Sequence, residues 1–306
     1  MKRLVFTVLA TLLTMVHPLA PASAEPAALR VLLIPADGGT ADGTKSDFKP
    51  LFDALSKTTG LSFDVRVGQS YAAVIEGMCA GQADIAWFGP SSFLTAQERG
   101  CAELLAVEER NGATTYYAGL FVRADSRIKS VKDLKGRTLA LGSSHSASSF
   151  AYPLAMLRDA GLDPVDDIAG LVLSESHSQG LMALSLGRVD AAGASLISFE
   201  QALNQGGLKA SDFRILAKSS AIPNPPLAVS SRLPAELKKT LRTALANLHE
   251  TPGIKADAIR GYGGKPVDRY ITDIDADELA EAAKVILFLD DDLKAALLRK
   301  AGAPAR

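Results

Sequence analysis

The chain has 306 residues, of which 47% are hydrophobic, 6% aromatic and 22% charged, and it contains two cysteines. This apolar fraction excludes a disordered chain, and this cysteine content excludes a small scaffold held together by disulfides. With 33 Lys and Arg against 34 Asp and Glu, the net charge of −1 gives no general attraction to nucleic acid or to an anionic membrane. Composition therefore indicates a soluble globular protein with a small-molecule partner.

The first 24 residues have the pattern of a secretory signal peptide. Basic residues at positions 2 and 3 precede an apolar run over 4–13, and Ala-Ser-Ala at 22–24 supplies small residues before a cleavage site. The run is too short for a stable anchor, and no later run approaches 20 apolar residues. An uncleaved N-terminal anchor is the alternative. We expect cleavage near Ala24 and export from the cytoplasm.

Export changes how the two cysteines are interpreted. Thiols in an oxidising compartment tend to pair, so Cys79 and Cys101 are expected to form a disulfide. The bond would close a loop of about 22 residues and stabilise the fold by about 3 kcal/mol. The alternatives are two buried free thiols, or a thiolate that binds a soft metal or metalloid.

Segments typical of strands and helices alternate along the chain. A continuous apolar run over 29–34 predicts a strand buried on both faces. Apolar residues then recur at helical spacing over 48–55, with Ser46 at the N-cap position, Pro50 in the first turn and Gly60 after the last turn. Repeated units of this length predict an α/β fold with helices on both sheet faces. Further expected elements are strands at 61–66, 84–88 and 138–141 and helices at 70–78 and 235–248.

Two segments look like crossings between lobes. A long strand pattern over 115–122 precedes a new set of elements, and a strand pattern over 213–217 leads into a Pro-rich connection at 222–226. Two crossings mean that the middle of the chain is inserted into a first lobe, which the C-terminal part completes. We therefore predict lobe 1 from 25–117 together with 223–306, and lobe 2 from 118–222.

Common catalytic motifs are out of register. Residues 38–46 resemble a phosphate-binding P-loop, but Thr44 separates Gly43 from Lys45 and breaks the G-x-x-x-x-G-K-[ST] pattern. Residues 142–146 lack the final glycine of the G-x-S-x-G turn. We expect no enzyme, no metal and no cofactor; a hydrolase with a spatially assembled Ser/His/Asp triad is the alternative.

Two strand-to-helix junctions are rich in serine. The first holds Ser91 and Ser92, and the second, over 143–149, holds five serines and a histidine. A helix N-terminus presents free N–H groups and partial positive charge, so serine hydroxyls there can surround an oxyanion. Such junctions face the cleft outside the carboxyl ends of parallel strands. An ordinary serine N-cap is the alternative for each junction alone, whereas both together predict a tetrahedral-oxyanion site without arginine.

Several blocks of sequence form one pattern, and they lie in chain order at 71–76, 81–90, 133–138, 176–177, 187–191 and 227–229. Together these blocks resemble the phosphonate-, phosphite- and phosphate-binding periplasmic proteins of ABC transporters. This resemblance implies a type II periplasmic-binding fold, in which two α/β lobes joined by a hinge close over a ligand in the interlobe cleft. It also implies a monomer in the periplasm with the membrane permease subunits of an ABC transporter as partners.

The resemblance assigns an oxyanion loop to four consecutive residues. The Ser-Thr-Ser-Gly loop of the family falls on Ser146, Ala147, Ser148 and Ser149, where alanine replaces threonine and serine replaces glycine. The loop therefore lacks one hydroxyl of the family pattern and gains another.

Other family positions also differ here. His177 matches a Ser-His pair, but Ser178 stands where a glutamate commonly follows, so the ammonium group of an aminoalkylphosphonate lacks its carboxylate. Phe93 replaces a frequent tyrosine. Tyr71 is expected to line the cleft and Trp87 to belong to the core. The complete expected binding set is Tyr71, Ser91, Ser92, Ser146, Ala147, Ser148, Ser149 and His177.

We therefore expect a periplasmic solute-binding protein that captures a phosphonate, phosphite or phosphate for ABC-transporter uptake. The alternative is a sensor that presents an oxyanion, such as arsenite or arsenate, to a membrane histidine kinase. Free thiols at Cys79 and Cys101 favour the sensor, whereas a disulfide favours transport.

Overall fold

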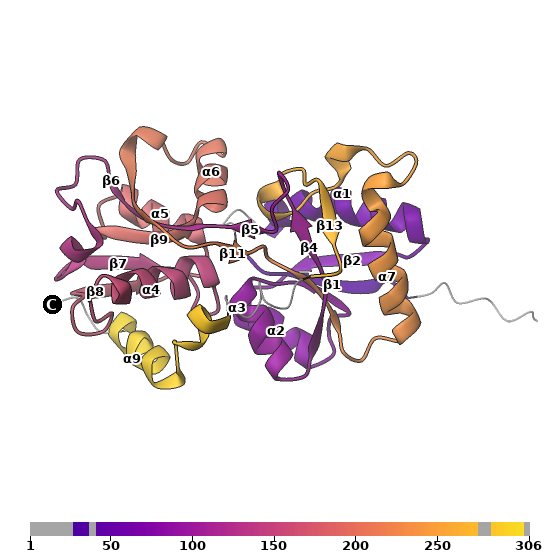
Figure 1. Ribbon diagram of the computed structural model, residues 1–306, viewed down its shortest axis with the longest axis horizontal. Helices are drawn as coiled ribbons and strands as arrows, with labels where there is room; N and C mark the ends of the chain where they lie inside the picture. Colours follow the sequence, from indigo (N-terminus) through magenta and orange to yellow (C-terminus); the bar gives the residue numbers. More distant parts are fainter. Residues whose placement is uncertain (1–26, 37–40, 275–282, 303–306) are drawn as a thin grey trace, which may run out of the picture.

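Two α/β lobes lie side by side in the computed structural model, which describes residues 27–36, 41–274 and 283–302 (Figure 1). The sheet of lobe 1 has the strand order β13-β4-β12-β3-β1-β2, and that of lobe 2 has the order β10-β6-β9-β7-β8. The predicted signal peptide, 1–24, lies outside the described residues. Within the described ranges, no helix combines the length and apolar character needed to cross a membrane.

Lobe 1 has a sheet that is parallel at one edge and antiparallel at the other. The apolar strand β1 pairs in parallel with β2 and β3, as its continuous hydrophobic run predicts. The strands are β1 (Leu29–Leu33), β2 (Phe63–Val67), β3 (Ile85–Trp87), β4 (Ala102–Glu109), β12 (Leu227–Ser230) and β13 (Arg269–Ile271), and the helices are α1 (Ala41–Thr59), α2 (Tyr71–Cys79), α3 (Pro90–Glu98) and α7 (Ala235–Asn247), with short helical turns η4 (Leu248–Glu250), η5 (Ala256–Ala258) and η6 (Tyr262–Gly264).

Lobe 2 is built from the middle of the chain. Its strand β7 pairs in parallel with β8 and β9, so the carboxyl ends of all three lie at one edge of the sheet. The strands are β6 (Ala118–Arg123), β7 (Thr138–Leu141), β8 (Gly170–Leu173), β9 (Ala191–Ser195) and β10 (Phe213–Lys218), and the helices are α4 (Tyr152–Asp159), α5 (His177–Ser185) and α6 (Leu196–Asn204), with short helical turns η1 (Val131–Leu134), η2 (Ala147–Ala151) and η3 (Ala210–Asp212).

A two-stranded ribbon connects the lobes. Strands β5 (Thr115–Tyr116) and β11 (Ile222–Pro223) pair antiparallel at the two places where the sequence predicted crossings (Figure 1). The long strand expected over 115–122 is divided at Tyr117, whose ring is covered by Lys218 with Nζ 3.5 Å from the ring centroid. The break lets the chain leave the ribbon and enter the sheet of lobe 2.

The C-terminal helix α9 (Asp291–Gly302) lies against lobe 2, where it packs on the edge strand β8 (Figure 1). Leu297 is fully buried, and the guanidinium carbon of Arg158 lies 4.2 Å from the centroid of the Phe288 ring. This placement differs from the expected assignment of all of 223–306 to lobe 1. The edge strand offers apolar surface that α9 covers, so the chain crosses between the lobes a third time.

The first helix also differs from its prediction. α1 begins at Ala41, before the expected N-cap at Ser46, and Pro50 lies inside the helix. Buried Thr44 extends the inward face by one turn, and burial of that face offsets the hydrogen bond that a proline cannot donate. The predicted end is confirmed, because Gly60 follows Thr59 with a φ of +72°.

Cys79 and Cys101 form a disulfide, as expected, which ties the end of α2 to the chain entering β4. The two cysteines are 22 positions apart, so replacing both with serine is expected to lower the free energy of unfolding by about 3 kcal/mol. Urea unfolding of C79S/C101S and of the wild type checks this, with the wild type in reducing agent as a control that must fall to the level of the variant. Equal stability of the oxidised wild type and the variant would contradict the prediction.

Candidate oxyanion site between the lobes

The two serine-rich junctions meet where the lobes face each other. α3 begins directly after β3 in lobe 1, η2 follows β7 in lobe 2, and these two helical segments are in contact. The serines of both junctions are buried except Ser144, and the exposed fractions of the buried ones lie between 0% for Ser92 and 6% for Ser91 and Ser143. The starts of two helical segments, where free N–H groups and partial positive charge are generally found, therefore meet at one buried contact between the lobes.

In lobe 1, the two serines have different roles. Ser92 is committed to the turn, because its Oγ accepts the N–H of Gly89 and donates to the carbonyl of Gly89, both at 3.0 Å. The Oγ of Ser91 is buried and has no hydrogen-bond partner among the described residues. A buried unpartnered hydroxyl costs free energy, which a ligand oxygen would recover.

In lobe 2, the predicted loop is an N-terminal turn with several hydroxyls. Ser146 caps it by accepting the N–H of Ser149 at 3.2 Å, and Ser148 accepts the hydroxyl of Tyr116 at 3.1 Å. Both therefore keep their own O–H for donation, while Ala147 contributes only its N–H. The Oγ of Ser149 is buried and, within the described ranges, lacks a partner.

The sequence did not reveal the importance of Gly142, at the end of β7. A Cβ at this position would lie 2.0 Å from Ser149 Oγ and 2.7 Å from Ser149 Cβ. Gly142 also donates its N–H to the carbonyl of Ser149 at 3.0 Å. The turn itself is widened, since the N–H of Tyr152 bonds to the carbonyl of Ala147 five residues back. Glycine therefore lets the strand approach the turn that presents Ser149.

His177 is a neutral donor that joins several elements. Its ring Nδ1 accepts the backbone N–H of Ser195 at 2.9 Å. The backbone N–H of His177 donates to the carbonyl of Ala36, in lobe 1, at 3.2 Å. Burial lowers the pKa of His177 to about 3, so the ring is neutral near pH 7. Because Nδ1 accepts, the proton lies on Nε2. His177 can therefore donate to an anion but gives the site no positive charge.

The predicted aromatic residues pack near the lobe 1 junction. Tyr71 is 2% exposed, and its ring lies 3.4 Å from the position that a Cβ on Gly89 would occupy, so it contacts the turn before α3. Its contact with a ligand stays a prediction. Trp87 is buried in the core, as expected, with its ring centroid 4.7 Å from that of Phe48, and Phe93 is buried as well.

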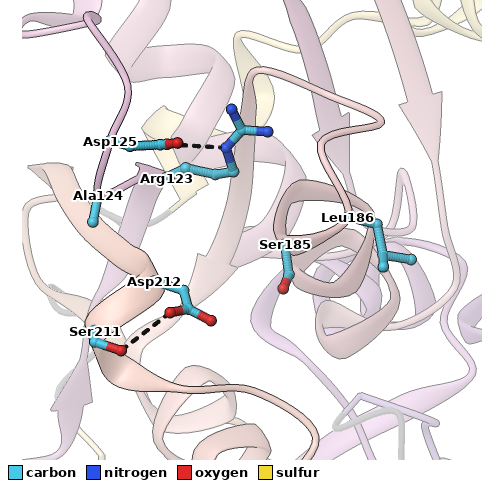
Figure 2. Close-up of a pocket in the computed structure, with 7 residues that line it drawn as sticks. All are labelled: Arg123, Ala124, Asp125, Ser185, Leu186, Ser211 and Asp212. Carbon is cyan, nitrogen blue, oxygen red and sulfur yellow. Dashed lines mark hydrogen bonds and ion pairs between the residues drawn. The ribbon is translucent and has the colours of Figure 1, made fainter.

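A pocket of about 500 Å3 elsewhere in lobe 2 does not share this chemistry (Figure 2). Its polar groups bond to each other: Arg123 to Asp125, and Ser211 to Asp212, both at 3.1 Å. β6 runs antiparallel to β9, so the pocket at the end of β6 lies at the opposite edge of the sheet from Ser195. It is therefore separate from the interlobe site.

Comparison with known proteins identifies the family of the chain. The sequence pattern of a family described as "ABC transporter, phosphonate, periplasmic substrate-binding protein" matches residues 39–265, more than half of the chain. The chain belongs to this family. Members of the family are periplasmic substrate-binding components of transporters, so transport rather than catalysis is the role of the class.

Individual relatives are distant. The chain is 28% identical over 232 residues, 72% of each chain, to the phosphate-import protein PhnD of Mycolicibacterium smegmatis. It is 25% identical over 258 residues, covering 83% of this chain and 75% of the relative, to the phosphonates-binding periplasmic protein of Escherichia coli. A binding protein of an ABC phosphonate transporter from Pseudomonas aeruginosa has a similar structure, with a TM-score of 0.75 at 24% identity over 90% of this chain and 96% of that chain. The expected type II periplasmic-binding fold is confirmed.

Proposed function

We propose that this protein captures a small phosphorus oxyanion in the interlobe site and delivers it to the permease of an ABC transporter. The observation that carries the proposal is the pair of buried hydroxyls of Ser91 and Ser149, which have no hydrogen-bond partner in the described part of the chain and lie on two helical segments that meet across the lobes. N–H groups, hydroxyls and helix dipoles together stabilise an oxyanion without a basic side chain.

The ligand that fits these residues has no positively charged substituent. None of the expected binding residues is an aspartate or a glutamate, and Ser178 stands where the family commonly has a glutamate. An ammonium group buried there would lack a counter-charge, which is costly. Methylphosphonate, phosphite and phosphate are therefore better candidates than aminoethylphosphonate. Two relatives carry the names of phosphate-import and phosphonates-binding proteins, which supports the same ligand class.

Hinge closure would bury the ligand. The ribbon of β5 and β11 lets the lobes move as rigid bodies, and closure brings the N-termini of α3 and η2 onto the anion from opposite sides. We infer that the protein acts as a monomer in the periplasm after cleavage of residues 1–24. The sensor hypothesis is less favoured, because it depends on a free thiolate and Cys79 and Cys101 are bonded to each other.

A ligand screen tests the proposal. Methylphosphonate, phosphite or phosphate at 100 times its Kd should stabilise the folded protein by about 2.7 kcal/mol, which raises Tm by roughly 5 °C or more. Differential scanning calorimetry should show a smaller shift with aminoethylphosphonate, because its ammonium group would lack a counter-charge. Arsenite and arsenate are included to test the sensor hypothesis. Sulfate serves as a tetrahedral control without phosphorus. If none of the three phosphorus oxyanions raises Tm, the proposed function is wrong.

A further inference from the structure

Tyr262 makes a contact between the lobes that the proposed oxyanion binding does not require. It lies in η6 of lobe 1, and its hydroxyl reaches the N-terminus of α6 in lobe 2. There it lies 2.8 Å from Ser195 Oγ and 2.6 Å from Ser198 Oγ. All three side chains are buried, with Ser195 and Ser198 at 0% exposure and Tyr262 at 2%. We call these residues the three-hydroxyl cluster.

Tyr262 is firmly part of lobe 1. Its N–H donates to Oε2 of the buried Glu108 at 2.6 Å, and Arg110 pairs with the same carboxylate at 3.1 Å. The ring centroid of Tyr262 lies 5.5 Å from that of Trp87 and 5.6 Å from that of Tyr116. Packing of this kind fixes the ring, so the hydroxyl is positioned before it meets α6.

The three-hydroxyl cluster adjoins the oxyanion site through shared elements. Ser195 is the last residue of β9, which packs against η2, and its N–H is the group that His177 accepts. Tyr116, against which Tyr262 packs, donates to Ser148. A change in the distance between Tyr262 and α6 therefore also changes the alignment of the two halves of the oxyanion site.

Other contacts from α6 to lobe 1 are more exposed. Gln201 donates to Oδ2 of Asp47 at 3.0 Å, and Glu200, which is more than half exposed, forms an ion pair with Lys265. Solvent weakens the Glu200–Lys265 ion pair. The Gln201–Asp47 bond is partly buried, and the three-hydroxyl cluster is the contact whose side chains are all buried to within 2%, so it is expected to contribute strongly to holding α6 against lobe 1.

We propose that Tyr262 is a closure latch, a positioning residue whose hydroxyl stabilises the closed form and so increases the affinity for the ligand. Its partners belong to the other lobe, so an opening motion that separates η6 from the N-terminus of α6 would break both hydrogen bonds. A contact that exists only in the closed form raises the population that is competent to hold ligand, and it slows release. The effect on affinity rests on the proposed function, whereas the effect on closure does not.

The variant Tyr262→Phe tests the latch, because it removes the hydroxyl and keeps the ring. Affinity for the tightest-binding phosphorus oxyanion of the screen should fall roughly tenfold, mainly through faster dissociation. Tyr270→Phe is the matched control, since its hydroxyl is buried too but donates to the carbonyl of Arg260 within lobe 1. It should bind like the wild type.

A second variant approaches the latch from the other lobe. Ser198→Ala should weaken binding in the same direction, and the double variant with Tyr262→Phe should lose less than the sum of the two single losses, because the same bond is removed twice. Additive losses, or wild-type affinity in both single variants, would overturn the proposal.

Closure is measured separately by small-angle X-ray scattering of the ligand-free proteins. Tyr262→Phe should have a larger radius of gyration than the wild type and Tyr270→Phe. If no oxyanion binds any of the proteins, the proposed function fails and scattering alone decides the latch. Identical scattering of Tyr262→Phe and the wild type would then refute it.

Discussion

Replacing Ser91 and Ser149 together with alanine is expected to weaken oxyanion binding by about a thousandfold. Each hydroxyl is buried without a partner among the described residues, and each should donate to a charged oxygen in the complex. A hydrogen bond to a charged group contributes about 1.5–3 kcal/mol, so two of them correspond to a loss of roughly 10²- to 10⁴-fold. Isothermal titration with the tightest-binding phosphorus oxyanion measures this, and each single variant should show an intermediate loss.

Ser230→Ala is the matched control for this pair. Ser230 is also buried in lobe 1, but its Oγ accepts the N–H of Arg232 at 3.3 Å, and it lies at the end of β12 next to Asp84, away from the start of α3. Binding by this variant should equal that of the wild type. A double variant S91A/S149A that binds within threefold of the wild type would show that these hydroxyls do not contact the ligand.

Acid is expected to destabilise the protein through His177. Burial lowers the pKa of His177 from 6.5 to about 3 in the folded state. Between these values the unfolded chain binds a proton that the folded chain does not, so the free energy of unfolding falls as the pH falls. The contribution of neutral His177 to the free energy of unfolding is complete above pH 6.5. It is lost progressively toward pH 3, by about 4 to 5 kcal/mol in total.

His177→Asn should remove this part of the pH dependence, because an amide oxygen can still accept the N–H of Ser195 and does not titrate. Urea unfolding at pH 7.5, 6, 5 and 4 compares the variant with the wild type. Glu108 acts in the opposite direction, since burial raises its pKa to about 7, but this contribution is common to both proteins and cancels. His249→Asn, at an exposed position, controls for loss of a histidine. Parallel stability curves for His177→Asn and the wild type would rule out this role.

Much of the fold could be predicted because apolar periodicity and helix-ending residues are local features of the sequence. The apolar strand over 138–141 is present with the same bounds, and the hinge strands lie at the predicted crossings. The break at Tyr117 and the packing of α9 on lobe 2 were missed. Both depend on contacts between segments distant in sequence, such as Lys218 over Tyr117, which leave no periodic pattern.

The candidate site was predictable to a similar degree. Serine is common at the first positions of a helix, and both serines follow a predicted strand, so Ser91 and Ser149 could be predicted as site residues from the sequence. Gly142 could not, because its importance comes from the approach of Ser149 in three dimensions. Tyr262 lies in an irregular segment, and 67 positions separate it from Ser195. No local motif connects the two.

The place of β12 in the lobe 1 sheet determines when the binding protein can be completed during folding. β12 pairs antiparallel with both β3 and β4 and lies between them, although it follows them by more than a whole lobe in sequence. The sheet of lobe 2 consists of consecutive segments between Ala118 and Lys218, so it can form as the chain emerges. The sheet of lobe 1 cannot be completed until β12, which begins at residue 227, is inserted between β3 and β4. The serine junction of lobe 1, at Ser91, therefore becomes ordered after the serine junction of lobe 2, at Ser149. A growing chain should acquire affinity for the ligand only after part of its last third has been synthesised.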